Sequence, residues 1–161
     1  MTEKYYNSIR RFITAKKLRL ILFTAIYNFL PAVVLVSYFI LLIYMYLHSD
    51  ERIMPCFFIP LFVFVSVSLV RKILNFNRPY EKLDIEPVFP KKTHGQSFPS
   101  RHTASAAVIA MAFLYVNTCL GIVFWIIAAL IAVSRICAGV HFLKDVAVGI
   151  IFPVVISLLF F

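Results

Sequence analysis

The chain has 161 residues, of which 62% are hydrophobic, and a mean hydropathy of +0.92. Soluble domains are about 45 to 50% apolar, so the composition excludes an ordinary soluble domain and indicates one membrane-embedded domain over residues 1–161. The net charge of +9 does not indicate nucleic-acid binding, because the cations lie beside apolar runs instead of forming a soluble basic domain. Anionic lipid head groups are the partner that such cations favour.

Residues 1–19 mix aromatic and aliphatic side chains with Lys and Arg. This mixture predicts an amphipathic helix that lies in the membrane interface with its cations toward the head groups. The alternative is a frayed basic tail.

Five apolar runs follow, each long enough to cross the hydrocarbon core as a helix; they are residues 20–47, 54–76, 101–118, 119–137 and 143–161. Transmembrane strands would need short alternating segments. The predicted fold is therefore all-α, an integral multi-pass membrane bundle of about five helices, with six as an alternative. The first run exceeds the roughly 7 to 15 apolar residues of a signal peptide, so we expect it to remain in the protein. Pro31 predicts a kink in it.

The connection at residues 77–100 is the one long polar segment, rich in proline and charge. Connections of this length are usually functional or disordered, and because polar motifs flank it, we expect an active-site loop. The run that follows contains many alanines and serines, which allow helices to approach closely in a membrane. It is expected at the centre of the bundle.

Three polar motifs lie at the ends of these runs. In the last, His141 and Asp145 are four residues apart and would share a face if this part is helical. A carboxylate that holds one imidazole nitrogen leaves the other free to act as a nucleophile or base. Asp145 could instead be an acid that stabilises a helix start. Arg135 ends the preceding run, where its guanidinium suits phosphate oxygens.

In the middle motif, Ser100 precedes an apolar run and is expected to be the N-cap residue of a helix whose free amides bind an anion. His102 would then stand beside the bound phosphate, placed to protonate a leaving alkoxide. Arg101 lies between them and is a further candidate phosphate ligand.

In the first motif, Arg71, Lys72 and Arg78 lie at the end of the second run, where a purely topological role is the alternative. Arg78 precedes a proline that restricts the backbone as the chain leaves the helix. Adjacent helical residues point about 100° apart, so only one of Arg71 and Lys72 is expected to reach a phosphate, and we favour Arg71.

Together, the three motifs resemble the signature of the type 2 phosphatidic acid phosphatase family: a lysine, six residues and Arg-Pro; then Pro-Ser-x-His; then Ser-Arg, five residues, His, three residues and Asp. The third motif matches fully, with Ser134, Arg135, His141 and Asp145. The second has Arg101 where many members have glycine. The first departs from the pattern, because the spacing falls on Arg71 while Lys72 is one position too close.

The resemblance implies a membrane phosphatase that acts on a phosphorylated lipid without a metal or other cofactor. His141 would attack phosphorus to form a phosphohistidine, His102 would protonate the leaving oxygen, and Asp145 would orient His141. Charge on the transferring phosphoryl group would be stabilised by nearby backbone amides and by four side chains, those of Arg71, Arg78, Ser100 and Arg135.

Other interpretations of the same residues differ in chemistry. A zinc site could use Cys137, His141, Asp145 and His102, although the surrounding cations would repel a divalent ion. A membrane protein that binds or transports lipid phosphate or another anion would need neither histidine. Soluble vanadium-dependent haloperoxidases resemble the same motifs, but five spanning segments argue against that reaction. The three cysteines show no CxxC spacing and are expected to be packing residues.

The side of the membrane is a point on which two arguments disagree. With five spans, all three motifs and 15 of the 16 Lys and Arg residues share one side, Arg52 being the exception, and the positive-inside rule makes that side cytoplasmic. The family resemblance implies an extracytoplasmic site, which we favour slightly, in the cell membrane. The lipid substrate and the oligomeric state are not predicted by the sequence.

Overall fold

The computed structural model describes residues 2–91 and 93–161, and within these ranges the chain forms helices and irregular connections without a strand. The prediction of an all-α fold is confirmed. The elements in chain order are α1 (Glu3–Thr14), α2 (Lys17–Thr24), the π-helix η1 (Ala25–Phe29), α3 (Leu30–Leu47), α4 (Ile53–Leu74), α5 (Pro79–Lys82), α6 (Arg101–Val116), α7 (Thr118–Cys137) and α8 (Leu143–Phe160).

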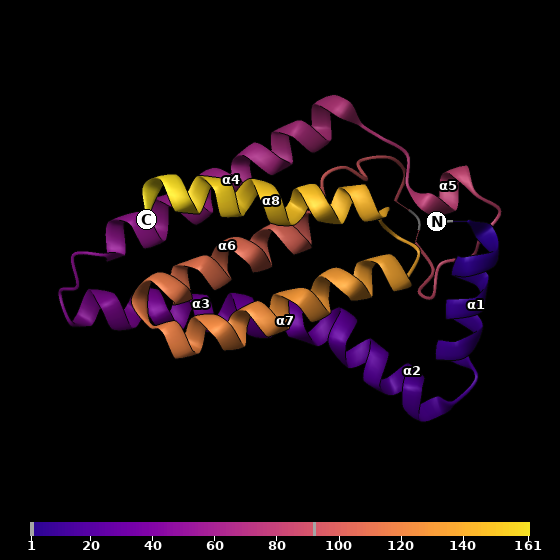
Figure 1. Cartoon of the computed structure of the whole chain (residues 1–161), viewed down its shortest axis with the longest axis horizontal. Helices are drawn as coiled ribbons and strands as arrows, with labels where there is room; N and C mark the ends of the chain where they lie inside the picture. The colour runs from indigo at the N-terminus through magenta and orange to yellow at the C-terminus, as the bar shows by residue number, and fades with distance from the viewer. Residues whose placement is uncertain (1, 92) are drawn as a thin grey trace.

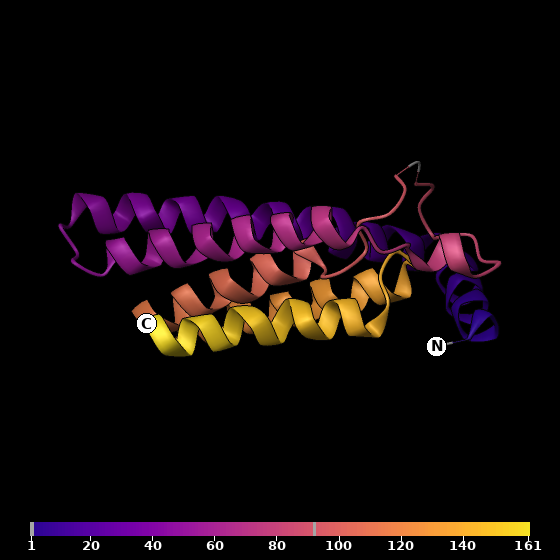
Figure 2. The same cartoon turned by 90° about the horizontal axis from the view of Figure 1, so that it is seen from above.

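The long helices run nearly parallel to one axis and form two layers around a central helix (Figures 1 and 2). Helices α3 and α4 lie in one layer, and α7 and α8 lie in the other. Helix α6 lies between them and contacts all four. The chain crosses the bundle an odd number of times, so its two termini lie at opposite ends.

Four helical stretches are long and apolar enough to span a membrane: Lys17–Leu47, Ile53–Lys82, Thr118–Cys137 and Leu143–Phe160. The fifth predicted span is present as α6, but it has only 16 residues and is therefore about 24 Å long at 1.5 Å per residue. The end of the polar loop fills the space before it, because Ser97 and Ser100 are both fully buried.

Helix α6 occupies the centre because its small side chains let the other helices approach it. Ten of its 16 residues are buried. At Gly149 of α8, a Cβ atom would lie 2.9 Å from the Ser100 carbonyl oxygen, so α8 packs closely against the start of α6. At the far end of α6, the rings of Phe113 and Phe124 stack with centroids 3.8 Å apart. The far end of α6 therefore packs against α7.

The kink expected at Pro31 takes the form of a π-helical turn, η1, directly before α3. Proline has no N–H to donate to the carbonyl four residues earlier, which is that of Tyr27. Helix α4 ends at Leu74, two residues before the predicted end of the second run, and its C-cap residue Asn75 adopts a left-handed backbone conformation with φ of 40°.

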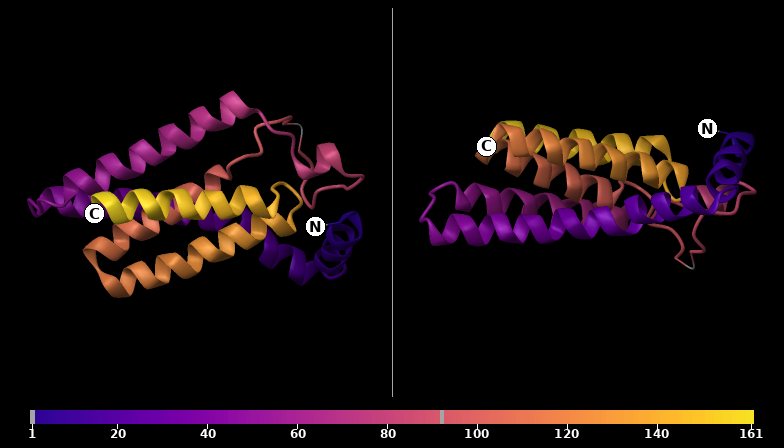
Figure 3. Two further views of the ribbon diagram at one scale, coloured as in Figure 1. Left: turned by 45° about the horizontal axis from the view of Figure 1, so that its top comes forward. Right: turned by 90° about the horizontal axis from the view of Figure 1, so that it is seen from below.

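The amphipathic helix predicted within residues 1–19 is α1, which lies across the long axis of the bundle at the end that carries the polar loop (Figure 3). It buries Tyr6 and Ile13, while its cations are exposed or half-buried. The cysteines differ from one another: Cys56 packs inside as expected, Cys137 is half-buried, and Cys119 is exposed.

Candidate active site

The turn between α7 and α8 brings His141 and Asp145 together. Both side chains are buried, and His141 Nδ1 lies 3.6 Å from Asp145 Oδ2. The expected shared helical face is wrong in detail, because His141 precedes α8. The contact arises since Asp145, in the first turn of α8, accepts a hydrogen bond of 2.9 Å from the Phe142 amide. Its carboxylate therefore both stabilises the helix start and faces the imidazole.

Each side chain of this pair has one polar atom without a hydrogen-bond partner. Within the described residues, His141 Nδ1 and Asp145 Oδ1 are buried and have no hydrogen-bond partner. A buried polar group without a partner costs about 1 to 3 kcal/mol. Such a cost is typical of sites that are arranged for a ligand or a reaction instead of for stability.

A serine that the sequence analysis did not select completes the surroundings of Asp145. Ser97 Oγ donates to Asp145 Oδ2 at 2.5 Å, and the Ser97 amide donates to the Phe76 carbonyl at 2.8 Å. The Ser100 amide donates to the Asp145 carbonyl at 2.8 Å. The signal available in the sequence was a hydroxyl in the loop three residues before Ser100, but only the folded loop shows where it points.

Arg71 turns into the bundle, whereas Lys72 is exposed. One guanidinium nitrogen of Arg71, Nη1, donates to the carbonyls of Pro99 at 2.6 Å and Ser97 at 3.3 Å. These bonds fix the cation against the loop segment that leads into α6. Of the two candidates in the first motif, Arg71 is the one whose charge lies inside the site.

Arg78 is half-buried and is held by the loop itself. Its Nε donates to the Gly95 carbonyl at 3.0 Å, and its amide donates to Glu81 Oε2 at 2.7 Å. Glu81 also accepts from the Gly95 amide. Gly95 has φ of +63°, and a Cβ there would lie 2.3 Å from Asn75 Oδ1, so a larger residue would strain the backbone and displace the Asn75 side chain. Glu81 and Gly95 together set the position of Arg78.

Arg135, near the end of α7, is buried and packs on Tyr27 of η1. Its guanidinium carbon lies 3.9 Å from the centre of the Tyr27 ring, and its Nη2 donates to the Tyr27 carbonyl at 2.7 Å. Its buried Nε has no partner within the described residues. One N–H group of the guanidinium therefore bonds to the protein, and the Nε–H group remains for a ligand. Ser134 donates to the Ile131 carbonyl of its own helix and takes no part in the site.

The start of α6 supplies the middle motif. Ser100 is the N-cap residue as expected, but its hydroxyl pairs with Thr103 Oγ1 at 3.0 Å and leaves the first amides of the helix uncapped. Arg101 and His102 are exposed and line a groove of about 590 Å³ that runs between α3, α4 and α6. Apart from these two side chains and two hydroxyls, the groove is apolar, with walls that include Leu35, Phe57 and Phe64.

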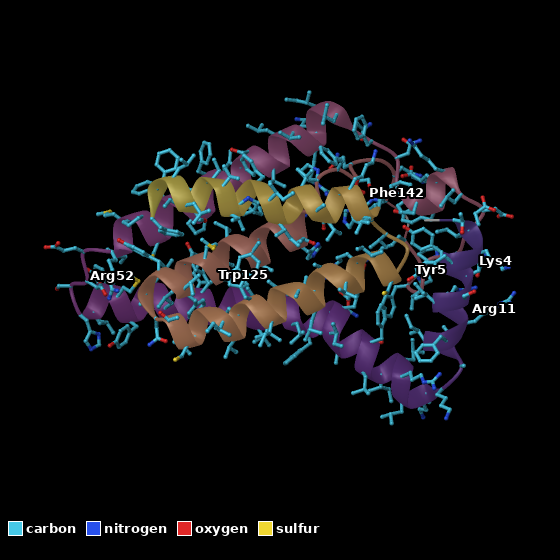
Figure 4. The ribbon with its side chains drawn as sticks, viewed as in Figure 1. Lys4, Tyr5, Arg11, Arg52, Trp125 and Phe142 are labelled. Carbon is cyan, nitrogen blue, oxygen red and sulfur yellow. The ribbon has the colours of Figure 1, made fainter. Side chains whose placement is uncertain are left out.

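Charges from all three motifs act on the two histidines. His102 lies within the influence of the charges of Arg71, Arg101, Arg135 and His141. His141 lies within the influence of the charges of Arg71, Arg78 and Asp145. The folded chain thus gathers four guanidinium groups and two imidazoles at one end of the bundle. This end contains Phe142, whereas Arg52 lies at the other end (Figure 4).

Burial, reinforced by Arg78 and Arg71 and opposed by Asp145, lowers the pKa of His141. A neutral ring at neutral pH suits a nucleophile.

The zinc alternative is not supported by this arrangement. In the parts of the chain that the structure describes, no three His, Cys, Asp or Glu side chains gather as a metal-binding group. The four guanidinium groups would also repel a divalent ion and are better matched by an anion.

Comparison with known proteins agrees with the motifs. The family model of the PAP2 superfamily matches residues 72–161, which is more than half of the chain. The chain belongs to the PAP2 superfamily. Arg71 and all of α1 to α3 lie before the matched region, so the parts of the site that come from Arg71 and Tyr27 are outside it.

Individual members of the superfamily resemble the chain to different extents. The undecaprenyl-diphosphatase BcrC of Bacillus subtilis (strain 168) is 33% identical over 84 residues, which are 52% of this chain and 43% of that protein. The chain thus matches less than half the length of this relative. The crystal structure of Aquifex aeolicus LpxE superposes with a TM-score of 0.74 at 29% identity and covers 94% of this chain and 92% of that one.

A second solved structure shows the fold alone. The transmembrane PAP2-type phosphatidylglycerolphosphate phosphatase from Bacillus subtilis superposes with a TM-score of 0.66 at 22% identity, and covers 97% of this chain and 82% of that one. The apolar helices and these neighbours identify the chain as a membrane protein.

Proposed function

We propose that this protein is a membrane lipid phosphatase that hydrolyses a phosphomonoester or diphosphate of a lipid through a phosphohistidine. The observation that carries the proposal is the buried contact of 3.6 Å between His141 Nδ1 and Asp145 Oδ2, surrounded by guanidinium groups. Because Nδ1 faces the carboxylate, Nε2 is the nitrogen left to attack. The similarity to a diphosphatase reported above supports this reaction class.

The reaction has two steps. In the first, His141 Nε2 attacks phosphorus, the bond from phosphorus to the lipid oxygen breaks, and His102 gives its proton to that oxygen. In the second, water attacks the phosphohistidine, the P–N bond breaks, and His102 takes the proton from water. Asp145 stabilises the positive charge that develops on His141. These steps use only side chains of this chain, so we expect activity without a metal.

The cations stabilise the transferring group. Phosphoryl transfer depends mainly on positioning and on neutralising the equatorial oxygens. The groups Arg71, Arg78 and Arg135 are each held by backbone carbonyls, so they need little reorganisation when the phosphate arrives. The uncapped amides at the start of α6 add donors to the same anion.

The apolar groove accommodates the lipid tail. It runs along α3, α4 and α6 and reaches His102 at its polar end. A tail in this groove places the ester oxygen beside His102 and the phosphorus beside His141. A phosphorylated lipid therefore fits the site better than a soluble phosphate ester.

The test is phosphate release from a panel of lipid phosphates by purified protein. We expect His141→Ala to abolish release, and Asp145→Asn to lower kcat by about 10² to 10⁴, as for loss of a positioned acid–base partner. His48→Ala is the control, since His48 lies at the end of α3 and should leave the rate unchanged. Unchanged function in His141→Ala would favour the rival proposal, a protein that binds or transports lipid phosphate without cleaving it.

The side of the membrane needs its own experiment. We infer an extracytoplasmic site in the cell membrane, because Arg71, Arg78 and Arg135 contact the site and are therefore weak indicators of topology. Lys82→Cys in the polar loop, combined with Cys119→Ser, should react with an impermeant thiol reagent on intact cells. In a protein that keeps Cys119 and lacks the Lys82→Cys substitution, Cys119 is exposed at the start of α7, and its labelling reports the opposite side of the membrane. Labelling of Lys82→Cys only after permeabilisation would place the site in the cytoplasm.

A further inference from the structure

Arg101 differs from the other arginines of the site in how it is held. Arg71, Arg78 and Arg135 each donate to a backbone carbonyl. Within the described residues, the Arg101 side chain makes no hydrogen bond or ion pair, and its guanidinium lies 5.9 Å from the centre of the Phe64 ring of α4. Its side chain is exposed at the groove. Arg101 is therefore a cation whose hydrogen-bonding capacity is free for a ligand.

The position of Arg101 relates it to the lipid side of the reaction. Arg101 and His102 both line the apolar groove, whereas Arg71, Arg78 and Arg135 do not. A lipid that extends from the groove toward His141 meets Arg101 and His102 before it reaches His141. The atoms beside Arg101 therefore belong to the leaving group, between the tail and the phosphorus that His141 attacks.

We propose that Arg101 binds the phosphate next to the tail in a lipid diphosphate, so that the site prefers a lipid diphosphate over the corresponding monophosphate. This inference rests on the proposed function. The leaving group of a monophosphate is an alkoxide that the proton of His102 neutralises, and it offers no further anionic oxygen. The leaving group of a diphosphate is a lipid phosphate, whose oxygens match the guanidinium fork.

The reaction balances in the same way as for a monoester. His141 Nε2 attacks the terminal phosphorus, the bond between that phosphorus and the bridging oxygen breaks, and the electron pair of this bond goes to the bridging oxygen. His102 donates its proton to this oxygen, and the lipid monophosphate leaves. Water then releases inorganic phosphate from His141 and returns the proton to His102. Arg101 neutralises the charge that appears on the leaving phosphate.

The test compares dodecyl diphosphate with dodecyl monophosphate as substrates in detergent micelles. Wild type should prefer the diphosphate. Arg101→Gln should lower kcat/KM for the diphosphate about tenfold to hundredfold, the range for a hydrogen bond to a charged group, and change the monophosphate value by less than about threefold. Arg101→Lys should recover part of the loss, because lysine restores the positive charge but not the paired donors of the planar guanidinium.

Lys144→Gln is the matched control. Lys144 is also an exposed cation near a ring, 5.3 Å from the centre of Phe76, but it does not line the groove. It should change neither substrate. Equal losses on both substrates in Arg101→Gln, or no loss on either, would overturn the assignment of Arg101 and leave the phosphatase proposal intact.

A second measurement separates this inference from the proposed reaction. If wild type hydrolyses neither substrate, the phosphatase proposal fails, and binding of dodecyl methylenediphosphonate and dodecyl phosphonate is then compared by calorimetry. Tighter binding of the diphosphonate that is lost in Arg101→Gln would support the role of Arg101. Equal binding of the two compounds by wild type would refute it.

Discussion

Arg135 of α7 is bound to Tyr27 in two ways: its guanidinium stacks on the ring at 3.9 Å, and its Nη2 donates to the backbone carbonyl at 2.7 Å. The carbonyl is accessible because residue 31, which would donate to it in a regular α-helix, is a proline. A break in the first spanning helix thus positions an arginine that lies more than a hundred residues later in the chain.

This relationship predicts opposite effects of Pro31→Ala on activity and stability. Alanine supplies an N–H that competes for the Tyr27 carbonyl, so Arg135 loses a fixed partner. We expect kcat/KM for a lipid phosphate to fall about fivefold, which corresponds to ~1 kcal/mol for one hydrogen bond. The melting temperature should stay constant or rise, because a proline within a continuous helix is unfavourable.

Pro55→Ala is the control for this substitution. Pro55 lies in the first turn of α4, where an N–H has no helical acceptor, so its replacement frees or blocks no carbonyl. Activity of Pro55→Ala should match wild type. A Pro31→Ala protein with full activity would show that the Tyr27 carbonyl does not matter for Arg135.

Ser97 predicts a change in turnover without a change in substrate binding. Its hydroxyl donates to Asp145 Oδ2 at 2.5 Å, while its carbonyl, which accepts from Arg71, is unaffected by a side-chain substitution. Ser97→Ala should therefore lower kcat about tenfold, as for loss of one hydrogen bond to a charged group, and leave KM within about twofold. Steady-state kinetics with a lipid phosphate measure both values.

The same measurement in two further backgrounds tests the cause. Ser134→Ala removes a buried hydroxyl that donates only within its own helix, and should change kcat by less than about twofold. In Asp145→Asn, adding Ser97→Ala should have little further effect, because residues that act as a unit are not additive. Full additivity would mean that Ser97 acts independently of Asp145.

The sequence predicted the elements of this fold because membrane helices are specified by long apolar runs, and it predicted α6 at the centre from its small residues. The motifs predicted which side chains gather at one end. The partners of those side chains were not predictable: the carbonyls of Tyr27, Gly95 and Pro99 are backbone groups with no side-chain signal, and they become available through a proline or a loop. The role of Ser97 likewise depends on the loop conformation.

The carboxylate of Glu81 predicts how acid affects the polar loop. Burial raises its pKa, but the hydrogen bonds from the amides of Arg78 and Gly95, together with the contact with His94, outweigh burial, so the pKa of Glu81 is lowered in the folded protein. Its stabilising contribution is therefore complete above the ordinary value of about 4.3 and is lost as the pH falls through the lower folded value. Below about pH 4, the Arg78 and Gly95 amides should exchange hydrogen faster.

Residue-resolved hydrogen exchange, corrected for the intrinsic rate, measures this effect. Glu81→Gln should give fast exchange at both amides already at neutral pH, without the change in acid, and should raise KM because Arg78 loses its support. Glu86→Gln, which replaces an exposed carboxylate paired with Arg10, should behave as wild type. A wild-type loop whose exchange does not change between pH 6 and 3 would contradict this role of Glu81.

Tyr6 of α1 predicts that the interfacial helix supports the turn that carries His141. Its ring is buried, its Oη lies 3.5 Å from the His141 carbonyl oxygen, and it faces Gly139, where a Cβ would lie 3.9 Å from the ring. Burial, with the charge of Asp145, raises the pKa of Tyr6 to about 12, so the hydroxyl remains a donor at neutral pH.

Two tyrosines that are adjacent in sequence provide the test of this role. Tyr6→Ala removes the packing under the turn and should lower kcat about tenfold, an effect of ~1.4 kcal/mol on the barrier, while Tyr6→Phe should lose only about twofold because the hydrogen bond is long. Tyr5 is 54% exposed, so Tyr5→Ala should leave kcat unchanged. Faster hydrogen exchange at residues 139–142 in Tyr6→Ala alone would locate the effect in the turn, whereas equal losses in Tyr5→Ala and Tyr6→Ala would mean that α1 acts only through membrane binding.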